Sequence, residues 1–101
     1  MYKDTNNGEQ RKAKRIIRKA LELGLTVSVS DGDRGWACKR ATDYTTILDA
    51  VGEMDTDELI FRNANGDKVG WLLLVWGNEP DGSELAADYT ANETMEALAA
   101  A

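Results

Sequence analysis

The sequence predicts an α+β domain of 101 residues with the element order α-ββ-α-ββ-α. Two observations support this prediction. Apolar residues recur with the 3.6-residue period of an amphipathic helix in three segments, and two pairs of β-type segments are each joined by a tight-turn dipeptide. Hairpins are antiparallel, and each has an apolar face that helices can cover. We therefore expect one domain over residues 1–101, with an antiparallel sheet of four or five strands, packed helices and a flexible N-terminus over residues 1–8.

The first helix is predicted between Asn7 and Gly24. Asn7 is placed to cap its start, with Gln10 at the position that a capping box requires, and Gly24 is the residue type that commonly ends a helix. Apolar residues at i, i+3, i+4, i+7 and i+8 form one stripe along it: Ala13, Ile16, Ile17, Ala20 and Leu21. The remaining face of this helix is basic.

Two hairpins are predicted around the turn dipeptides Asp31-Gly32 and Asn65-Gly66. Their strands are, in chain order, residues 25–30, 35–40, 59–61 and 69–76. The last strand, 69–76, is apolar at nearly every position, so we expect it to be covered on both faces, as a central strand or at the interface of a homodimer. Residues 77–83 have the composition of a loop, and residues 85–89 are either a short extra strand or a lead-in to the last helix.

Two further helices follow the hairpins. One is predicted over residues 43–51, with Thr42 or Asp43 as its cap. The other is expected after Thr90, which forms a capping box with Glu93. Its apolar stripe is Ala91, Met95, Leu98 and Ala99.

The two halves of the chain resemble each other. Residues 30–36 match residues 64–71 around the turn dipeptide, and the tripeptide Asp-Tyr-Thr occurs at 43–45 and again at 88–90. Two interpretations are open. The chain is a duplicated hairpin–helix unit, or similar hairpins use similar turn residues.

The composition excludes several classes of chemistry. The chain has no His and a single Cys, so it has no His general base, no His-ligated metal and no internal disulfide. Cys38 is predicted to be a buried, inert thiol on a strand. We therefore expect no enzymatic activity, no catalytic residue, no metal and no cofactor; a carboxylate-based hydrolase is the alternative, and it requires two acids that face each other in a cleft.

The placement of the chain in the cell and the role of its tryptophans are also expectations. No apolar run approaches the ~20 residues of a membrane span. The segment 1–12 lacks the apolar core of a signal peptide, so a cytoplasmic location is expected.

Trp36, Trp71 and Trp76 could stack on bases or sugars, but in so small a domain we expect at least two of the three to pack in the core.

The charges are distributed unevenly along the chain. The formal net charge is −6, yet residues 1–20 carry seven basic and two acidic side chains. The candidate partner-binding acids lie in the last long loop and at its exit: Glu79, Asp81, Glu84 and Asp88. A second inter-element segment adds Glu53, Asp55, Asp57 and Glu58.

Each charged group has two interpretations. The acids either bind a basic partner or belong to ordinary solvated loops. The alternative candidate site is the basic face of the first helix, composed of Arg11, Lys12, Lys14, Arg15, Arg18 and Lys19. That face binds nucleic acid or matches acidic groups within the molecule.

Residues 69–78 and 87–93 resemble stretches in small acidic accessory proteins of bacteriophages and mobile elements. The resemblance implies a protein-binding inhibitor of a host nucleic-acid-binding defence system, such as an anti-CRISPR protein, acting through an acidic surface in the host cytoplasm. It implies no site residue. The expected function is thus a non-enzymatic protein-binding accessory protein, and direct nucleic-acid binding through the basic helix is the alternative.

Overall fold

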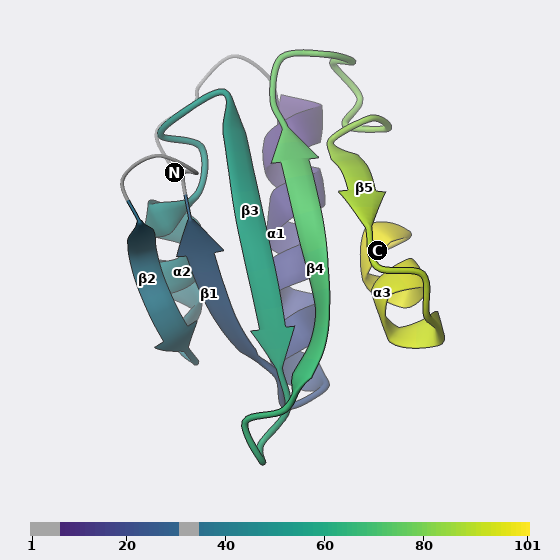
Figure 1. Cartoon of the computed structure of the whole chain (residues 1–101). Helices are drawn as coiled ribbons and strands as arrows, with labels where there is room; N and C mark the ends of the chain where they lie inside the picture. The colour runs from purple at the N-terminus through teal and green to yellow at the C-terminus, as the bar shows by residue number, and fades with distance from the viewer. Residues whose placement is uncertain (1–6, 31–34) are drawn as a thin grey trace.

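The computed structural model describes residues 7–30 and 35–101, and the α+β prediction is confirmed (Figure 1). The elements are α1 (Asn7–Glu22), β1 (Thr26–Ser30), β2 (Trp36–Ala41), α2 (Tyr44–Ala50), β3 (Thr56–Arg62), β4 (Lys68–Val75), β5 (Ala86–Tyr89) and α3 (Glu93–Ala99). The turn dipeptide Asp31-Gly32 and residues 1–6 of the expected flexible N-terminus lie outside the described residues. Asn7 and Gly8, which that expectation included, are the first residues of α1.

The five strands form one antiparallel sheet in the order β2-β1-β3-β4-β5. The two predicted hairpins lie side by side, because β1 pairs with β3 over residues 26–30 and 58–62. The segment 85–89, for which a strand or a lead-in was open, is the edge strand β5 paired with β4.

All three helices pack against the same face of the sheet (Figure 1). The apolar stripe of α1 is buried there through Ile16 and Ile17, and Met95 of α3 and Ile47 of α2 complete the same core. The strands contribute alternate residues to it, as their period of two requires. These inward residues are Val27, Val29, Leu59, Phe61, Leu72 and Leu74.

The strand predicted over 69–76 is internal to the sheet, as expected, but helices cover only one of its faces. Leu72 and Leu74 point into the core, whereas Trp71, Leu73 and Val75 are half-buried on the opposite face. Its continuous apolar sequence therefore reflects two different environments. One is the core, and the other is a sheet face with no described helix against it (Figure 1).

The helix caps are predicted correctly for α2 and wrongly for α3. The Asp43 carboxylate accepts hydrogen bonds from the backbone N–H and the hydroxyl of Thr46, each at 2.9 Å, and these bonds lower the pKa of Asp43. The cap of α3 is Asn92, whose side-chain oxygen accepts from Met95 N–H at 2.8 Å. Thr90 extends the pairing of β5 instead, since its N–H donates to the Trp71 carbonyl and its hydroxyl accepts from Trp71 N–H.

The repeat seen in the sequence corresponds to a structural repeat only in its hairpins. Both halves provide an antiparallel hairpin, and the two hairpins meet through β1 and β3. The repeated tripeptide has no common role: Asp43 caps a helix, whereas Asp88 and Tyr89 lie in a strand.

Candidate binding surfaces

The loop that contains most of the candidate acids, the β4–β5 loop (residues 76–85), is fastened to the start of α1. Glu9, only 1% exposed, accepts hydrogen bonds from Gly77 N–H on both carboxylate oxygens, at 3.1 and 2.9 Å. A carboxylate buried in this way is stabilised by the hydrogen bonds it accepts. The loop is thus held at its first residues by a side chain 68 positions away in sequence.

The backbones of the loop and the helix also approach closely. A Cβ atom placed on Gly8 would lie 2.1 Å from the Pro80 carbonyl oxygen, and one on Gly82 would lie 2.6 Å from the Gly8 oxygen. Neither position has room for a side chain. The two glycines let the loop lie directly on the first turn of α1.

Three of the four predicted acids are exposed on this ordered loop: Glu79, Asp81 and Glu84. Asp81 Oδ1 accepts from Ser83 N–H at 2.9 Å, and hydrogen bonds from Ser83 lower the pKa of Asp81. The fourth acid is elsewhere. Asp88 lies on β5 directly opposite Leu73 of β4, so it belongs to the sheet face that the helices leave uncovered.

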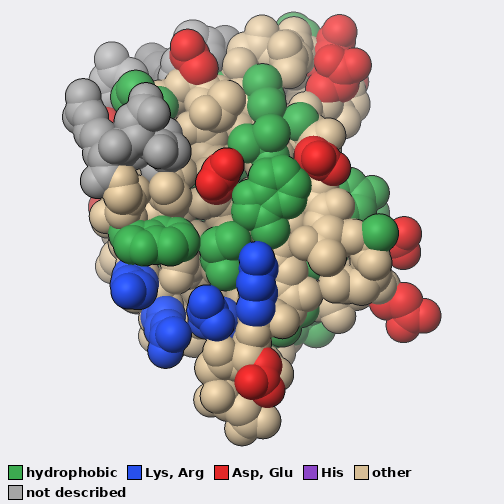
Figure 2. Space-filling view, in the orientation of Figure 1, with side chains coloured by type: hydrophobic (Ala, Val, Ile, Leu, Met, Phe, Trp, Pro, Cys, Tyr) green, Lys and Arg blue, Asp and Glu red, His purple; other side chains and the backbone are tan. Residues whose placement is uncertain are grey.

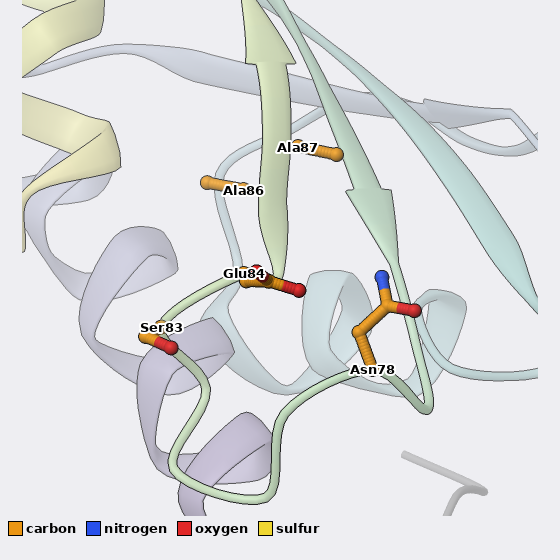
Figure 3. A pocket seen from close by; sticks show the side chains of 5 residues that line it. All are labelled: Asn78, Ser83, Glu84, Ala86 and Ala87. Carbon is orange, nitrogen blue, oxygen red and sulfur yellow. The ribbon is translucent and has the colours of Figure 1, made fainter.

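A shallow pocket of about 340 Å³ lies where the loop enters β5 (Figure 3). It is lined by Asn78, Ser83, Glu84, Ala86 and Ala87. The Glu84 side chain extends toward the side of the pocket from which Asn78 projects. The pocket thus combines one carboxylate with an amide, a hydroxyl and two methyl groups.

The second group of predicted acids does not form one surface. Asp57 is 1% exposed, and its Oδ2 accepts from Gly52 N–H and from Trp76 Nε1–H, each at 2.8 Å. Its role is structural, and its prediction as a partner-binding acid is wrong. Glu53 and Asp55 are exposed ahead of β3, and Glu58 is exposed on β3.

Half of the predicted basic face of α1 is engaged inside the molecule. Lys12 Nζ donates to the carbonyl oxygens of Ala99 and Ala101, and Arg15 Nε donates to that of Ala101 at 3.2 Å. Burial, and then the neighbouring Arg15 charge, lower the pKa of Lys12. The Arg18 guanidinium lies 5.1 Å from the centre of the Tyr44 ring, within the range of a cation–π contact.

These contacts favour the interpretation in which the basic face binds groups within the molecule. The groups it binds are not the acidic side chains that were expected. The cations meet carbonyl oxygens at the end of α3 and the aromatic ring at the start of α2. Arg11 and Lys19 are exposed, and Lys14 is half-buried.

The sheet face away from the helices, which we call the open face, is a surface that the sequence did not reveal. Residues directly opposite one another in the sheet share a face, so the register defines its rows. The first row runs across all five strands: Trp36, Ser30, Glu58, Leu73 and Asp88. The second contains Ser28, Ile60 and Trp71, and the third Thr26, Arg62 and Lys68.

Cations border this face at one end. A β-bulge places Lys39 and Arg40 of β2 opposite Ser28, and both are exposed. They join Arg62 and Lys68 of the third row. Figure 2 shows hydrophobic side chains along the middle of the face and Lys and Arg side chains gathered below them, with Asp and Glu side chains at the top and on both sides of the hydrophobic ones.

The expectation that at least two tryptophans pack in the core is wrong. Trp76 is buried, 6% exposed, but Trp36 is 48% exposed and Trp71 is half-buried on the open face. The sequence did place Trp71 on one side of its strand, because successive strand side chains alternate and Trp71 therefore shares a face with Leu73 and Val75, not with Leu72 and Leu74. The sequence does not say which of these two faces packs against the helices.

Three observations concern the groups that bond-making chemistry would use. Among residues 7–30 and 35–101, no group of three or more His, Cys, Asp or Glu side chains could hold a metal ion. Burial raises the pKa of the Cys38 thiol, which disfavours the reactive thiolate. The pocket beside the β4–β5 loop is lined by one acid, Glu84, where a carboxylate hydrolase needs two.

Comparisons with known proteins identify no relative of this chain, so a function can be proposed only from the geometry of its surfaces. No protein-family model matches the chain, and searches of curated proteins and of solved structures give no match. None of the helices in the described part of the chain has both the length and the apolar character needed to cross a membrane.

Proposed function

We propose that the chain is a non-enzymatic binding module that uses the β4–β5 loop to hold a basic segment of a partner protein. The observation that carries the proposal is the attachment of an acidic loop to α1. Glu9 holds Gly77, and the Gly8 and Gly82 backbones touch, so Glu79, Asp81 and Glu84 are presented from a loop that is already ordered.

Order in the free protein favours binding, because less conformational entropy is lost when the partner docks. The pocket supplies a complementary place for one side chain. The methyl groups of Ala86 and Ala87 can contact the apolar stem of a Lys or Arg, while the Glu84 carboxylate pairs with its charged end.

A protein that handles nucleic acid is the partner class that this chemistry fits. Such proteins carry Lys and Arg side chains placed to contact phosphates, and acids on an ordered loop can occupy the same cations. The chain would then inhibit the partner by competing with its nucleic acid. The proposed role as an inhibitor of a host defence protein is of this kind.

The test is a titration of a fluorescent oligo-arginine peptide into the purified chain, followed by anisotropy. The variant is Glu84→Lys, and the matched control is Glu22→Lys, which makes the same charge change on an exposed residue at the end of α1. We expect Glu84→Lys to weaken binding about tenfold, because attraction and repulsion at a single exposed charge are each worth up to about 1 kcal/mol.

The control should weaken binding much less. Equal losses in the two variants would mean that net charge, not the loop, attracts the peptide, and would overturn the proposal. The inhibitory role has its own readout: excess chain should release a labelled oligonucleotide from a basic nucleic-acid-binding protein, and Glu84→Lys should reduce that release.

A further inference from the structure

The open face has two tryptophans at a spacing that follows from the register. Trp36 and Trp71 lie on strands that are three positions apart, β2 and β4, and one row apart along the strands. With strands about 4.8 Å apart and about 6.8 Å between rows, their Cα atoms are separated by about 16 Å. Ile60 lies directly opposite Trp71 and extends the apolar surface toward β1.

Between the two rings the face contains polar groups of β1 as well as Ile60. Ser28 is only 3% exposed, and its hydroxyl accepts from Arg40 N–H at 2.8 Å. That hydrogen bond fixes the bulge, where Arg40 adopts a left-handed φ of 50°. The bulge places Lys39 and Arg40 near the same end of the strands as Arg62, which lies on the central strand β3.

The charges of the open face are separated along the strands. Arg62 is held against the β3–β4 hairpin, since its Nη1 donates to the Gly66 carbonyl at 3.0 Å. With Lys39, Arg40 and Lys68 it makes a cationic border beside the second row. Glu58 and Asp88 lie in the first row, which also contains Trp36, at the end of the face away from Arg62 and Lys68.

From this arrangement we infer that the open face binds a single-stranded polynucleotide, with bases stacked on Trp36 and Trp71 and phosphates along the cationic border. Unpaired bases stack on aromatic side chains, and Lys and Arg side chains beside them contact the backbone; this combination binds single strands with little sequence preference. The bases of a duplex are already stacked on one another, so they cannot stack on the tryptophan rings of the open face.

A protein partner fits the open face less well. The centres of protein–protein interfaces are depleted in Lys, Glu and Asp, whereas the rows of this face contain Lys68, Glu58 and Asp88, with Lys39 beside them. The inference uses residues that are separate from the β4–β5 loop, so it does not depend on the proposed function.

The test is a titration of fluorescent oligothymidylate and oligouridylate, each of about 12 nucleotides, at low and increasing salt. Trp36→Ala removes an exposed side chain with no role in the core, and Lys39→Gln with Lys68→Gln removes two border charges. The matched controls are Leu23→Ala, an exposed apolar residue beyond the end of α1, and Lys19→Gln, an exposed cation on α1.

We expect Trp36→Ala to weaken binding at least about fivefold without changing the salt dependence, because stacking is not ionic. The double Lys variant should reduce the slope of log K against log salt by about 1.4, since each neutralised phosphate contact of a single strand contributes about 0.7. Both controls should bind as the unchanged chain does. Equal binding of thymidylate and uridylate would mean that the site reads neither the 2′-hydroxyl nor the thymine methyl group, as expected for stacking with little sequence preference.

Several outcomes would overturn the inference. One is the absence of oligonucleotide binding at low salt. Another is an equal loss in Lys19→Gln, which would place the site on α1. A third is a dimer of the unchanged chain that Trp36→Ala dissociates, which would mean that a second copy covers the face. Binding of an acidic peptide in place of the oligonucleotides would identify a protein partner.

Discussion

Asp57 is a buried carboxylate at the junction of three segments. It lies on β3, and its Oδ2 accepts from Gly52 after α2 and from the Trp76 indole after β4. Removal of a carboxylate from water is unfavourable unless hydrogen bonds compensate it. These two donors, both at 2.8 Å, provide that compensation and fix the start of the β4–β5 loop.

Replacement of Asp57 should therefore destabilise the fold through its two donors. Asp57→Ala leaves the Gly52 and Trp76 donors without this acceptor, and we expect the free energy of unfolding to fall by about 2–4 kcal/mol. Asp57→Asn keeps an oxygen that can accept both bonds, so its loss should be smaller. Urea denaturation followed by tryptophan fluorescence measures both changes, and equal losses would contradict an acceptor role.

At the scale of elements, the contact between α1 and the β4–β5 loop holds the loop in its position. The contact joins the beginning of the first helix to a loop near the far end of the chain, through Glu9, Gly8 and Gly82. It is also the contact on which the order of the proposed binding loop rests.

Gly8→Ala tests this contact. The new Cβ would lie 2.1 Å from the Pro80 carbonyl oxygen, a backbone atom, so the loop must move away. We expect a loss of about 1–3 kcal/mol in the free energy of unfolding, as for other overpacked sites. Hydrogen exchange at Gly77 N–H should become faster, because the hydrogen bond that it donates to the Glu9 carboxylate is weakened when the loop moves.

The matched control is Gly70→Ala. Its Cβ would lie 2.4 Å from Cγ of Met95, a buried side chain of α3, so this variant strains the contact between β4 and α3 and not the β4–β5 loop. Hydrogen exchange at Gly77 should not change in this variant. A rise in stability of Gly8→Ala, from the better helix propensity of Ala, would contradict the close backbone contact.

The same elements show how far the sequence leads. Helices and strands were predictable because their periods are local, and so was the Asp43 cap, whose acceptor and donor are three residues apart. The wrong predictions concern long-range contacts. Thr90 has the sequence of a cap but pairs with Trp71 of β4, and Asp57 has the sequence of a loop acid but binds Trp76.

The candidate surfaces were predictable to different degrees for the same reason. Glu79, Asp81 and Glu84 are close in sequence, so the structure keeps them on one loop. The open face is assembled from β1 to β5 through the register, and no local pattern states that register. The expectation that at least two of the three tryptophans pack in the core was wrong for this reason, since only Trp76 is buried.

For the whole molecule, the uneven distribution of charge between the basic residues 1–20 and the acidic remainder of the chain corresponds to a distribution in space. The basic helix uses Lys12, Arg15 and Arg18 to hold α3 and α2 on the sheet. Three of the later acids lie on the β4–β5 loop, and Glu58 and Asp88 lie in the first row of the open face, while cations of β2, β3 and β4 border its other end (Figure 2). A chain with a net charge of −6 thus has a locally cationic surface.

The uncovered face leads to a prediction about self-association. A stable homodimer buries about 800 Å² or more on each partner, and the centre of its interface is depleted in charged residues. The open face has Glu58 in its first row and Arg62 in its third, so two copies placed face to face would bury charges on both sides of the apolar band. We therefore expect light scattering in about 0.15 M salt to give the mass of a monomer, 11.1 kDa. A mass of twice that value, reduced to the monomer by Trp36→Ala, would contradict this prediction and would show that the apolar band of β4 is covered by a second copy.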